Sequence, residues 1–303
     1  MNPLLATLGS KLTERWLNLL VLPGALFLAA TAVGTTLGHR HWHDGERLRS
    51  TLDELAARPA LDRAGTAALL VAFVLLGATA ASLAAQFLGG AIERYRLRFG
   101  RDPLSRALTA RRIRRWRELD RRYEGALGAV STAEGRPSVP PDVRARIEHL
   151  AEARDRVALR IPNRPTWYGD RVQAAAERVH LAYGVDLAAL WPRLWLTLPE
   201  PAVRQIQAAH DSFTAAARLT AWAVGYAVLA CWWWPAALVA LGCAAVARSR
   251  AHDALDALAE LIEAAVDVHG RELAERVGLI GTEPQVLGRA VGDRMSELFR
   301  KAE

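Results

Sequence analysis

Long apolar stretches alternate with charged segments of helical period along this chain. Residues 16–38, 64–92 and 219–247 contain no charged side chain. Because about 20 apolar residues cross a bilayer core of about 30 Å, the pattern predicts membrane-spanning helices in these three places. For the first stretch a cleaved signal peptide is the alternative, since Ala30-Thr31-Ala32 resembles a cleavage site. The stretch is, however, longer than a typical signal core.

The third apolar stretch, residues 218–250, is interrupted in its middle by Trp232, Trp233, Trp234 and Pro235. As one helix its uncharged part would be roughly 43 Å long at about 1.5 Å per residue, well beyond the bilayer core. Indole rings prefer the headgroup level and proline opens a turn. We therefore predict a short membrane hairpin whose tip is the tryptophan triplet. One kinked helix is the alternative.

The intervening segment, residues 93–217, has helical periodicity throughout and no alternating strand pattern. Prolines and glycines at residues 134–141 predict a break between two of its helices. Capping residues predict further boundaries, with an N-cap at Thr166, a helix-ending glycine at Gly184 and an N-cap at Asp186.

The last helical segment, residues 251–277, is amphipathic. Its apolar face carries Leu255, Leu258, Ile262, Val266, His269 and Leu273, and its acidic residues lie mostly on the other face. We expect it to pack on the basic domain or on a second copy of the chain, which would make a homo-oligomer. Gly278 and Gly281 are expected to end it, and the tail from Thr282 is predicted to be loose.

Arginines flank the second apolar stretch at Arg94, Arg96, Arg98 and Arg101. By the positive-inside rule this flank is cytoplasmic, which places the loop 39–63 outside and both termini inside. The predicted fold class is therefore all-α: a polytopic membrane protein with four transmembrane helices, two plus a short hairpin, and a helical cytoplasmic domain. Its predicted parts are a two-span segment (1–92), the cytoplasmic domain (93–217), the hairpin (218–250) and a cytoplasmic amphipathic helix with its tail (251–303).

Small or polar residues recur every four positions in the second span, at Ala78, Ser82, Gln86 and Gly90. One narrow stripe of the helix would then let a neighbouring backbone approach closely, so we interpret it as a packing seam. The alternative is a pore lining formed by Ser82, Gln86 and the glycines.

Charge is concentrated in one short segment. The chain has 303 residues and a formal net charge of +7, and seven arginines fall within residues 111–122. Such a cluster can bind anionic lipid headgroups, at about 1 kcal/mol per basic residue, or pair with the acidic C-terminal helix. We do not expect nucleic acid as a partner, because the cluster follows a membrane span and matches no nucleic-acid-binding motif. The candidate contact residues for lipid or a protein partner are Arg111, Arg112, Arg114, Arg115, Trp116, Arg117, Trp191, Arg193 and Trp195.

Three short motifs follow one another in order: Pro165-Thr166-Trp167-Tyr168-Gly169-Asp170, Tyr183-Gly184-Val185-Asp186 and Trp191-Pro192-Arg193-Leu194. Over residues 160–250 the chain resembles a group of uncharacterised bacterial multi-pass membrane proteins. These carry Pro-Thr-x-x-Gly-[Asn/Asp], Tyr-Gly-x-Asp and Trp-Pro-Arg-Leu before a membrane hairpin. The resemblance implies an integral protein of the bacterial cytoplasmic (inner) membrane and implies no activity.

From the residues themselves, we interpret these motifs as a folding joint built from helix caps and interfacial side chains. The alternative is a ligand pocket formed by Asp170, Arg171 and Arg193.

Three imidazoles in the first loop, at His39, His41 and His43, would face one way in an extended conformation and could chelate zinc or copper. No further histidine or cysteine lies nearby in the sequence to complete a site, so a plain juxtamembrane loop is the preferred interpretation. Cys231 and Cys243 lie inside the third apolar stretch and are expected to be small buried hydrophobes.

The sequence contains no Ser/His/Asp order, glycine-rich phosphate loop or nucleophile elbow, so we expect neither an enzyme nor a cofactor. We predict a non-enzymatic inner-membrane anchor, scaffold or sensor that engages a cytoplasmic protein partner through its basic helical domain. An oligomeric ion channel or pore is the alternative, by analogy of architecture.

Overall fold

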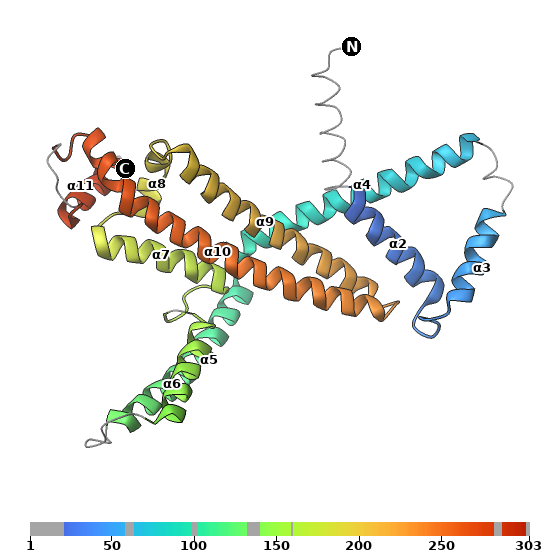
Figure 1. The fold of residues 1–303 in the computed structure, drawn as a ribbon, viewed down its shortest axis with the longest axis horizontal. Helices are drawn as coiled ribbons and strands as arrows, with labels where there is room; N and C mark the ends of the chain where they lie inside the picture. The colour runs from blue at the N-terminus through green and yellow to red at the C-terminus, as the bar shows by residue number, and fades with distance from the viewer. Residues whose placement is uncertain are drawn as a thin grey trace, which may run out of the picture. The chain divides into compact units, whose positions relative to one another are not determined.

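A computed structural model describes residues 21–57, 64–97, 102–131, 140–158, 160–281 and 287–300, and within these ranges every regular element is a helix. The all-α prediction is therefore confirmed for the described part of the chain. In order, the helices are α2 (Leu22–Leu37), α3 (Gly45–Ala56), α4 (Ala64–Leu97), α5 (Pro103–Ser131), α6 (Pro141–Asp155), α7 (Trp167–Tyr183), α8 (Leu187–Trp195), α9 (Glu200–Leu229), α10 (Pro235–Arg276) and α11 (Arg289–Arg300) (Figure 1).

The helices belong to two compact units. The first, which we call the apolar unit, comprises the described residues up to Glu93 together with Thr214–Ala251. The second, the polar unit, comprises Arg94–Phe213 and the described residues from His252 onward. The long helices α9 and α10 each have one part in the apolar unit and the other part in the polar unit.

The apolar unit packs through small residues. Gly24 of α2 lies directly against the backbone of Ala78 on α4, where a side chain at position 24 would collide with it. On the same helix α4, Ala78, Ser82, Ala85 and Gly89 are buried. The predicted packing seam is therefore confirmed, although its buried residues follow the helical period and not a strict repeat of four.

Among the described residues, α4 is the one helix that is long and apolar enough to cross a membrane. Its qualifying part, Gly65–Leu97, has 33 residues; the most apolar 18-residue window within it has a mean hydropathy of 2.3, and only 11% of that window is buried. α2 is apolar but shorter. The first predicted span begins at residue 16, and its start lies outside the described residues.

The third apolar stretch forms two helices and not one. α9 ends at Leu229, the backbone N–H of Trp233 donates to the Leu229 carbonyl over 3.0 Å, and α10 begins at Pro235. Arg250 of α10 lines the same cavity as Ala215 of α9, so the two arms run antiparallel (Figure 1). The predicted hairpin geometry at the tryptophan triplet is confirmed, and the kinked single helix is excluded.

The second arm of this hairpin does not stop where the charges begin. α10 continues unbroken for 42 residues, so the predicted arm and the predicted amphipathic C-terminal helix are one element. It ends before Gly278, whose φ of 76° is in the left-handed region, as the glycine signal indicated.

The polar unit has a core of large apolar side chains contributed by α7, α8, α9, α10 and α11. Leu190, Leu194, Val266 and Met295 are almost completely buried there. The prediction that the tail is loose from Thr282 onward is thus wrong for α11, which is an ordered helix. Residues 282–286 lie outside the described part. Its Gly292 lies directly against the Tyr183 carbonyl, so the missing side chain lets the helix dock closely.

Helix boundaries in the polar unit follow the predicted caps. The Thr166 hydroxyl accepts the N–H of Gly169 at 3.2 Å, and the Asp186 carboxylate accepts the N–H of Ala188 at 3.0 Å. Gly184 ends α7 with a φ of 71°. All three predicted boundaries are confirmed, which supports the interpretation of the motif region as a folding joint. Most of the predicted break at 134–141 lies outside the described residues.

Candidate functional site

Helix α5 separates its arginines onto two faces. Arg111, Arg114, Arg115 and Arg117 are exposed. Positions 111, 114 and 115 are neighbours on one face because residues three and four apart meet on a helix surface. Arg121 and Arg122 extend this surface, and both pair with Glu118, at 2.7 and 3.0 Å. We call the exposed set Arg111, Arg114, Arg115 and Arg117 the arginine face.

The opposite side of α5 is fixed to the rest of the polar unit. Arg112 donates to the Asp170 carboxylate over 2.5 Å, to the Arg164 carbonyl over 2.7 Å and to the Val157 carbonyl. The indole N–H of Trp116, which is 9% exposed, donates to the Ala158 carbonyl over 2.9 Å. Arg112 and Trp116 were predicted as lipid or partner contacts, but their polar groups are engaged inside the unit and do not belong to the arginine face.

Helix α6 packs alongside α5 and stiffens it (Figure 1). The Arg154 guanidinium of α6 bonds to Asp120 of α5 over 3.2 Å and stacks over the Tyr123 ring at 4.7 Å from its centroid. Cation–π contact and an ion pair from one side chain hold the two helices together. The arginine face is therefore presented on a braced helical hairpin.

Asp170 of the first motif is a structural acceptor. Its carboxylate accepts the backbone N–H groups of Asn163 at 3.1 Å and Arg164 at 3.0 Å, in addition to Arg112. The Arg164 guanidinium donates to the Gln173 side chain over 3.2 Å and to the Leu97 carbonyl over 3.0 Å. Burial lowers the pKa of Arg164, and the charge of Asp170 opposes that shift. These bonds fix the loop before α7 in one conformation.

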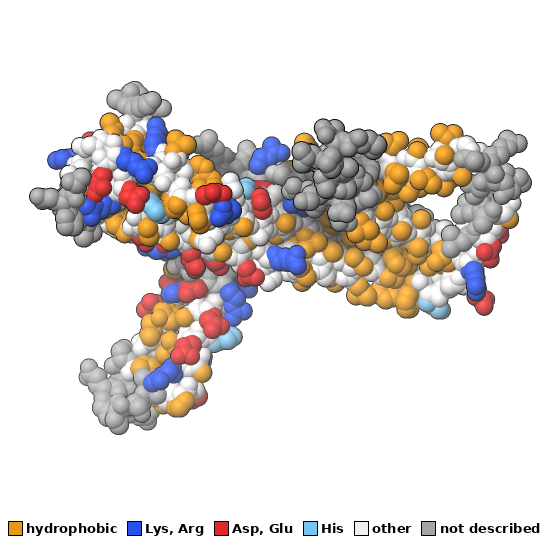
Figure 2. Space-filling model, turned by 45° about the horizontal axis from the view of Figure 1, so that its top comes forward, with side chains coloured by type: hydrophobic (Ala, Val, Ile, Leu, Met, Phe, Trp, Pro, Cys, Tyr) orange, Lys and Arg blue, Asp and Glu red, His pale blue; other side chains and the backbone are white. Residues whose placement is uncertain are grey.

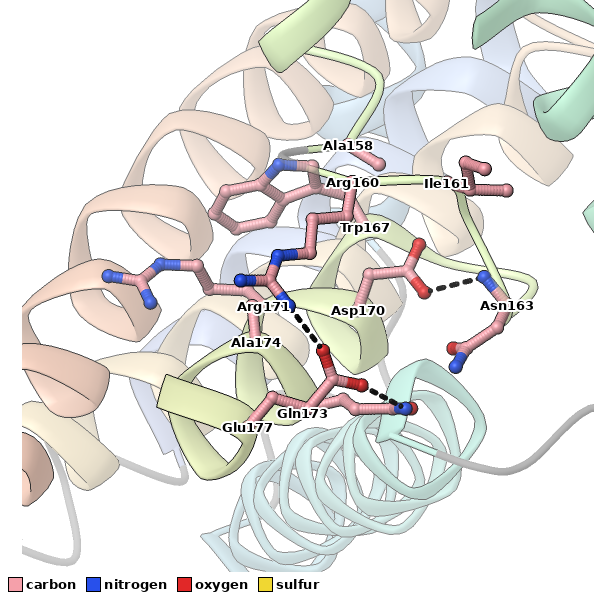
Figure 3. Close-up of a pocket in the computed structure, with 10 residues that line it drawn as sticks. All are labelled: Ala158, Arg160, Ile161, Asn163, Trp167, Asp170, Arg171, Gln173, Ala174 and Glu177. Carbon is pink, nitrogen blue, oxygen red and sulfur yellow. Dashed lines mark hydrogen bonds and ion pairs between the residues drawn. The ribbon is translucent and has the colours of Figure 1, made fainter. Parts of the chain in front are cut away.

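Asp170 and Arg171 do line a small cavity, together with Arg160 and Trp167 (Figure 3). Its volume of about 30 Å³ is enough for one or two water molecules and far below the roughly 300 Å³ of a small-molecule site. The structure thus brings Asp170 and Arg171 of the predicted ligand pocket together at one cavity, whereas Arg193 does not line it. Both side chains also serve the internal network.

The acidic face of α10 pairs with α7. Arg171, 7% exposed, donates to Asp256 over 2.5 Å, and Arg178 forms an ion pair with Glu263. The Tyr183 hydroxyl donates to Asp267 over 2.8 Å, and this hydrogen bond raises the pKa of Tyr183. The predicted pairing of the C-terminal helix with the arginine cluster is wrong for these acids, since α7 supplies their partners.

The third motif also packs internally. The Arg193 guanidinium donates to the Ala189 carbonyl over 3.0 Å and lies over the Phe299 ring of α11, 5.2 Å from its centroid. Trp191 and Trp195 contact each other at 5.7 Å between ring centroids, and both are half-buried. These three predicted contact residues thus lie against the core of the polar unit.

The histidines of the first loop do not converge. The His39 Nε2 atom lies 2.9 Å from the Cys231 carbonyl, and the His41 Nδ1 atom lies 3.2 Å from the Arg47 guanidinium. Within the described residues no group of three potential ligands could hold a metal ion. The metal-site alternative for His39, His41 and His43 therefore gains no support, and the loop instead contacts the tip of the α9–α10 hairpin.

A second cavity lies in the apolar unit. It has a volume of about 230 Å³ and is lined by Pro23, Ser82, Ala85, Gln86, Ala215, Arg218, Leu219, Trp222 and Arg250. Two of these residues, Ser82 and Gln86, belong to the pore-lining alternative, but the arginines of the cavity were not predicted to join them. The sequence signal for the arginines is that Arg218 and Arg250 lie at the two ends of the third apolar stretch, which a hairpin brings together.

No protein-family model, curated protein or solved structure matches the chain. The functional assignment therefore rests on the geometry described above.

Proposed function

We propose that the chain is a non-enzymatic, four-span protein of the bacterial cytoplasmic membrane that holds a braced, arginine-bearing hairpin for an acidic protein partner. The observation that carries the proposal is the division of α5. Arg111, Arg114 and Arg115 are exposed, whereas Arg112 and Trp116 fix the opposite side of the same helix.

The membrane part of the proposal draws on which side chains the apolar unit exposes. Phe73 is 79% exposed and Phe87 is 77% exposed, and Figure 2 shows such apolar side chains gathered over much of the visible surface of this unit. In water this exposure would be unfavourable at roughly 25 cal/mol per Å² of apolar surface. Lipid removes that cost, and α2, α4 and the two arms of the hairpin supply four apolar segments.

The proposed topology, with the loop 39–63 and the hairpin tip on one side, agrees with two contacts. The Trp42 and Trp234 rings meet at 4.9 Å between centroids, and His39 contacts Cys231. Both pairs join the first loop to the hairpin tip. Four spans with these two connections outside would leave both termini and the arginine face in the cytoplasm, as the positive-inside rule requires.

A matched pair of variants tests the partner role. Arg114→Gln/Arg115→Gln removes two charges from the arginine face, and Arg144→Gln/Arg146→Gln removes two exposed charges from α6 of the same hairpin. We expect photo-crosslinking from position 111 of the full-length protein in native membranes to yield a protein adduct. The first variant should lose it and the second should retain it.

Two outcomes would overturn this proposal. One is recovery of lipid alone at position 111, which would make the arginine face a membrane contact. The other is ion conductance of the purified protein in liposomes, which would favour the channel alternative. In either case the intramolecular network of Arg112 and Trp116 would be unaffected.

A further inference from the structure

The cavity of the apolar unit gathers two cations in a largely apolar environment. Arg218 of α9 and Arg250 of α10 both line it, and no carboxylate is among the residues that line it. Neither guanidinium forms an ion pair or a hydrogen bond with another residue of the described ranges. Two unpaired guanidinium groups beside one cavity attract an anion, since close like charges repel each other unless a counter-charge is bound.

The position of Arg218 is built into the helix packing. Gly89 of α4 lies against it, so that a Cβ atom at position 89 would be 2.9 Å from the Arg218 Cγ atom and 3.0 Å from its Cα atom. Only a residue without a side chain allows this approach. Gly89 lies one helical turn before Glu93, where the apolar stretch of α4 ends, so Arg218 is close to the end of the apolar segment.

The remaining lining adds a polar donor and an apolar wall. The Gln86 amide can donate a hydrogen bond, and Leu219 and Trp222 present apolar surface beside Arg218. The volume of about 230 Å³ exceeds the roughly 15 Å³ that one water needs and is smaller than a drug-sized pocket of about 300 Å³ or more. A compact anionic group with an apolar attachment matches these dimensions and this chemistry.

We propose that this cavity binds the phosphate group of an anionic phospholipid. Arg218 and Arg250 hold the phosphate oxygens, for which the planar guanidinium offers paired N–H donors. Gln86 donates to a further oxygen, and the acyl chains follow the exposed apolar surface of the unit. This inference rests on the membrane placement in the proposed function and is independent of the partner of the arginine face.

Native mass spectrometry of the full-length protein, extracted in mild detergent and titrated with phosphatidylglycerol, tests the site. We expect one tightly retained lipid per chain. Arg218→Gln and Arg250→Gln should each weaken its binding about tenfold or more, because each removes a charge-assisted contact to phosphate. Ala215→Leu, at an exposed lining position, should weaken it by filling the cavity while both charges stay.

The matched control is Arg248→Gln, which removes the same charge two residues from Arg250 at an exposed position that does not line the cavity. It should retain the lipid. Equal losses in Arg248→Gln and Arg250→Gln would overturn the site in favour of diffuse surface attraction. Displacement of the lipid by millimolar inorganic phosphate, or equal retention of phosphatidylcholine, would also overturn it.

The failure of this site can be distinguished from failure of the proposed function. If the chain extracts from cells with the membrane fraction and yet retains no phosphatidylglycerol, the lipid site alone is wrong. If the chain is recovered in the soluble fraction, the membrane placement is wrong and the lipid site is overturned with it.

Discussion

The two units of this chain bury opposite kinds of side chain. In the polar unit Leu190, Leu194 and Met295 are at most 1% exposed. In the apolar unit the buried positions are mostly alanine and glycine, as at Ala78 and Ala217, and the large residues face outward. A water-soluble core excludes water from large apolar groups, whereas helices in lipid gain little from burying leucine and associate through small residues.

The difference teaches that the proposed membrane placement of the apolar unit is supported by which residues it buries, and not by its composition alone. Both units are helical and alanine-rich, and the long helices α9 and α10 each run through both. What distinguishes them is which residues occupy the helix contacts: small residues in one unit, large apolar residues in the other. Shortening a large side chain should therefore destabilise the polar unit more, and enlarging a small residue at a helix contact should destabilise the apolar unit.

The largest expected difference between the units comes from truncating one large side chain in each of them. Leu194→Ala should destabilise the polar unit by about 2–5 kcal/mol, because it leaves a cavity in a packed core. Phe73→Ala, at a side chain that is 79% exposed, should cost less than about 0.5 kcal/mol in detergent micelles. Thermal unfolding of the full-length protein in detergent measures both.

The contrast between the two units would not hold if Phe73→Ala destabilised the protein as much as Leu194→Ala. That result would place Phe73 in a protein contact, for example with a second copy of the chain, and not in lipid. Cross-linking of the wild type at several protein concentrations would then show whether such a contact exists.

A smaller effect is expected from enlarging a glycine at a helix crossing. Gly24→Ala should cost about 1–3 kcal/mol, because the new methyl group collides with the Ala78 backbone and the helices must separate. Gly242→Ala is the matched control in the same unit, since no atom lies within 4 Å of its added methyl group. There the gain in helix propensity should stabilise α10 by up to about 1 kcal/mol.

Differential scanning fluorimetry of both glycine variants in one detergent gives the comparison directly. Equal melting temperatures for the two variants would contradict the close crossing of α2 and α4. A lower melting temperature for Gly24→Ala alone would support the conclusion that small residues form the helix contacts of the apolar unit.

Much of the local structure could be predicted from the sequence, because the signals are local. Thr166, Gly184 and Asp186 mark helix ends through capping chemistry that needs only neighbouring residues. The tryptophan triplet with Pro235 marked the hairpin turn for the same reason. The two-unit division was also accessible in outline, since hydropathy separates the apolar stretches from the charged ones.

Other features depend on contacts between distant residues and could not be predicted. Arg112 has the same side chain as its exposed neighbours, and only the folded loop carrying Asp170 makes it internal. α11 is mostly polar, and its order depends on Met295, Phe299 and the close approach that Gly292 allows. Nothing local in the sequence shows that these residues meet α7 and α8.

The smallest predicted effect is electrostatic and lies in the polar unit. Because this unit is exposed to water, its stability should depend on pH. Arg300 of α11 bonds to the Asp186 carboxylate over 2.7 Å, and this hydrogen bond lowers the pKa of Asp186 below its usual value. Because the folded-state pKa is lowered, the contribution is present above the unfolded pKa of about 4 and is lost as the pH falls through the folded pKa. Its size should be about 0.5–1 kcal/mol, since Arg300 is largely exposed.

Asp186→Asn tests this contribution while keeping the N-cap, because asparagine caps helices about as well as aspartate. At pH 7 the variant should melt slightly below the wild type, and the difference should shrink as the pH is lowered below about 4. Arg300→Gln should show the same convergence, because it removes the other partner of the pair. A difference that persists unchanged at low pH would mean that the substitution disturbs the N-cap of α8, and that charge does not link α11 to the α8 N-terminus.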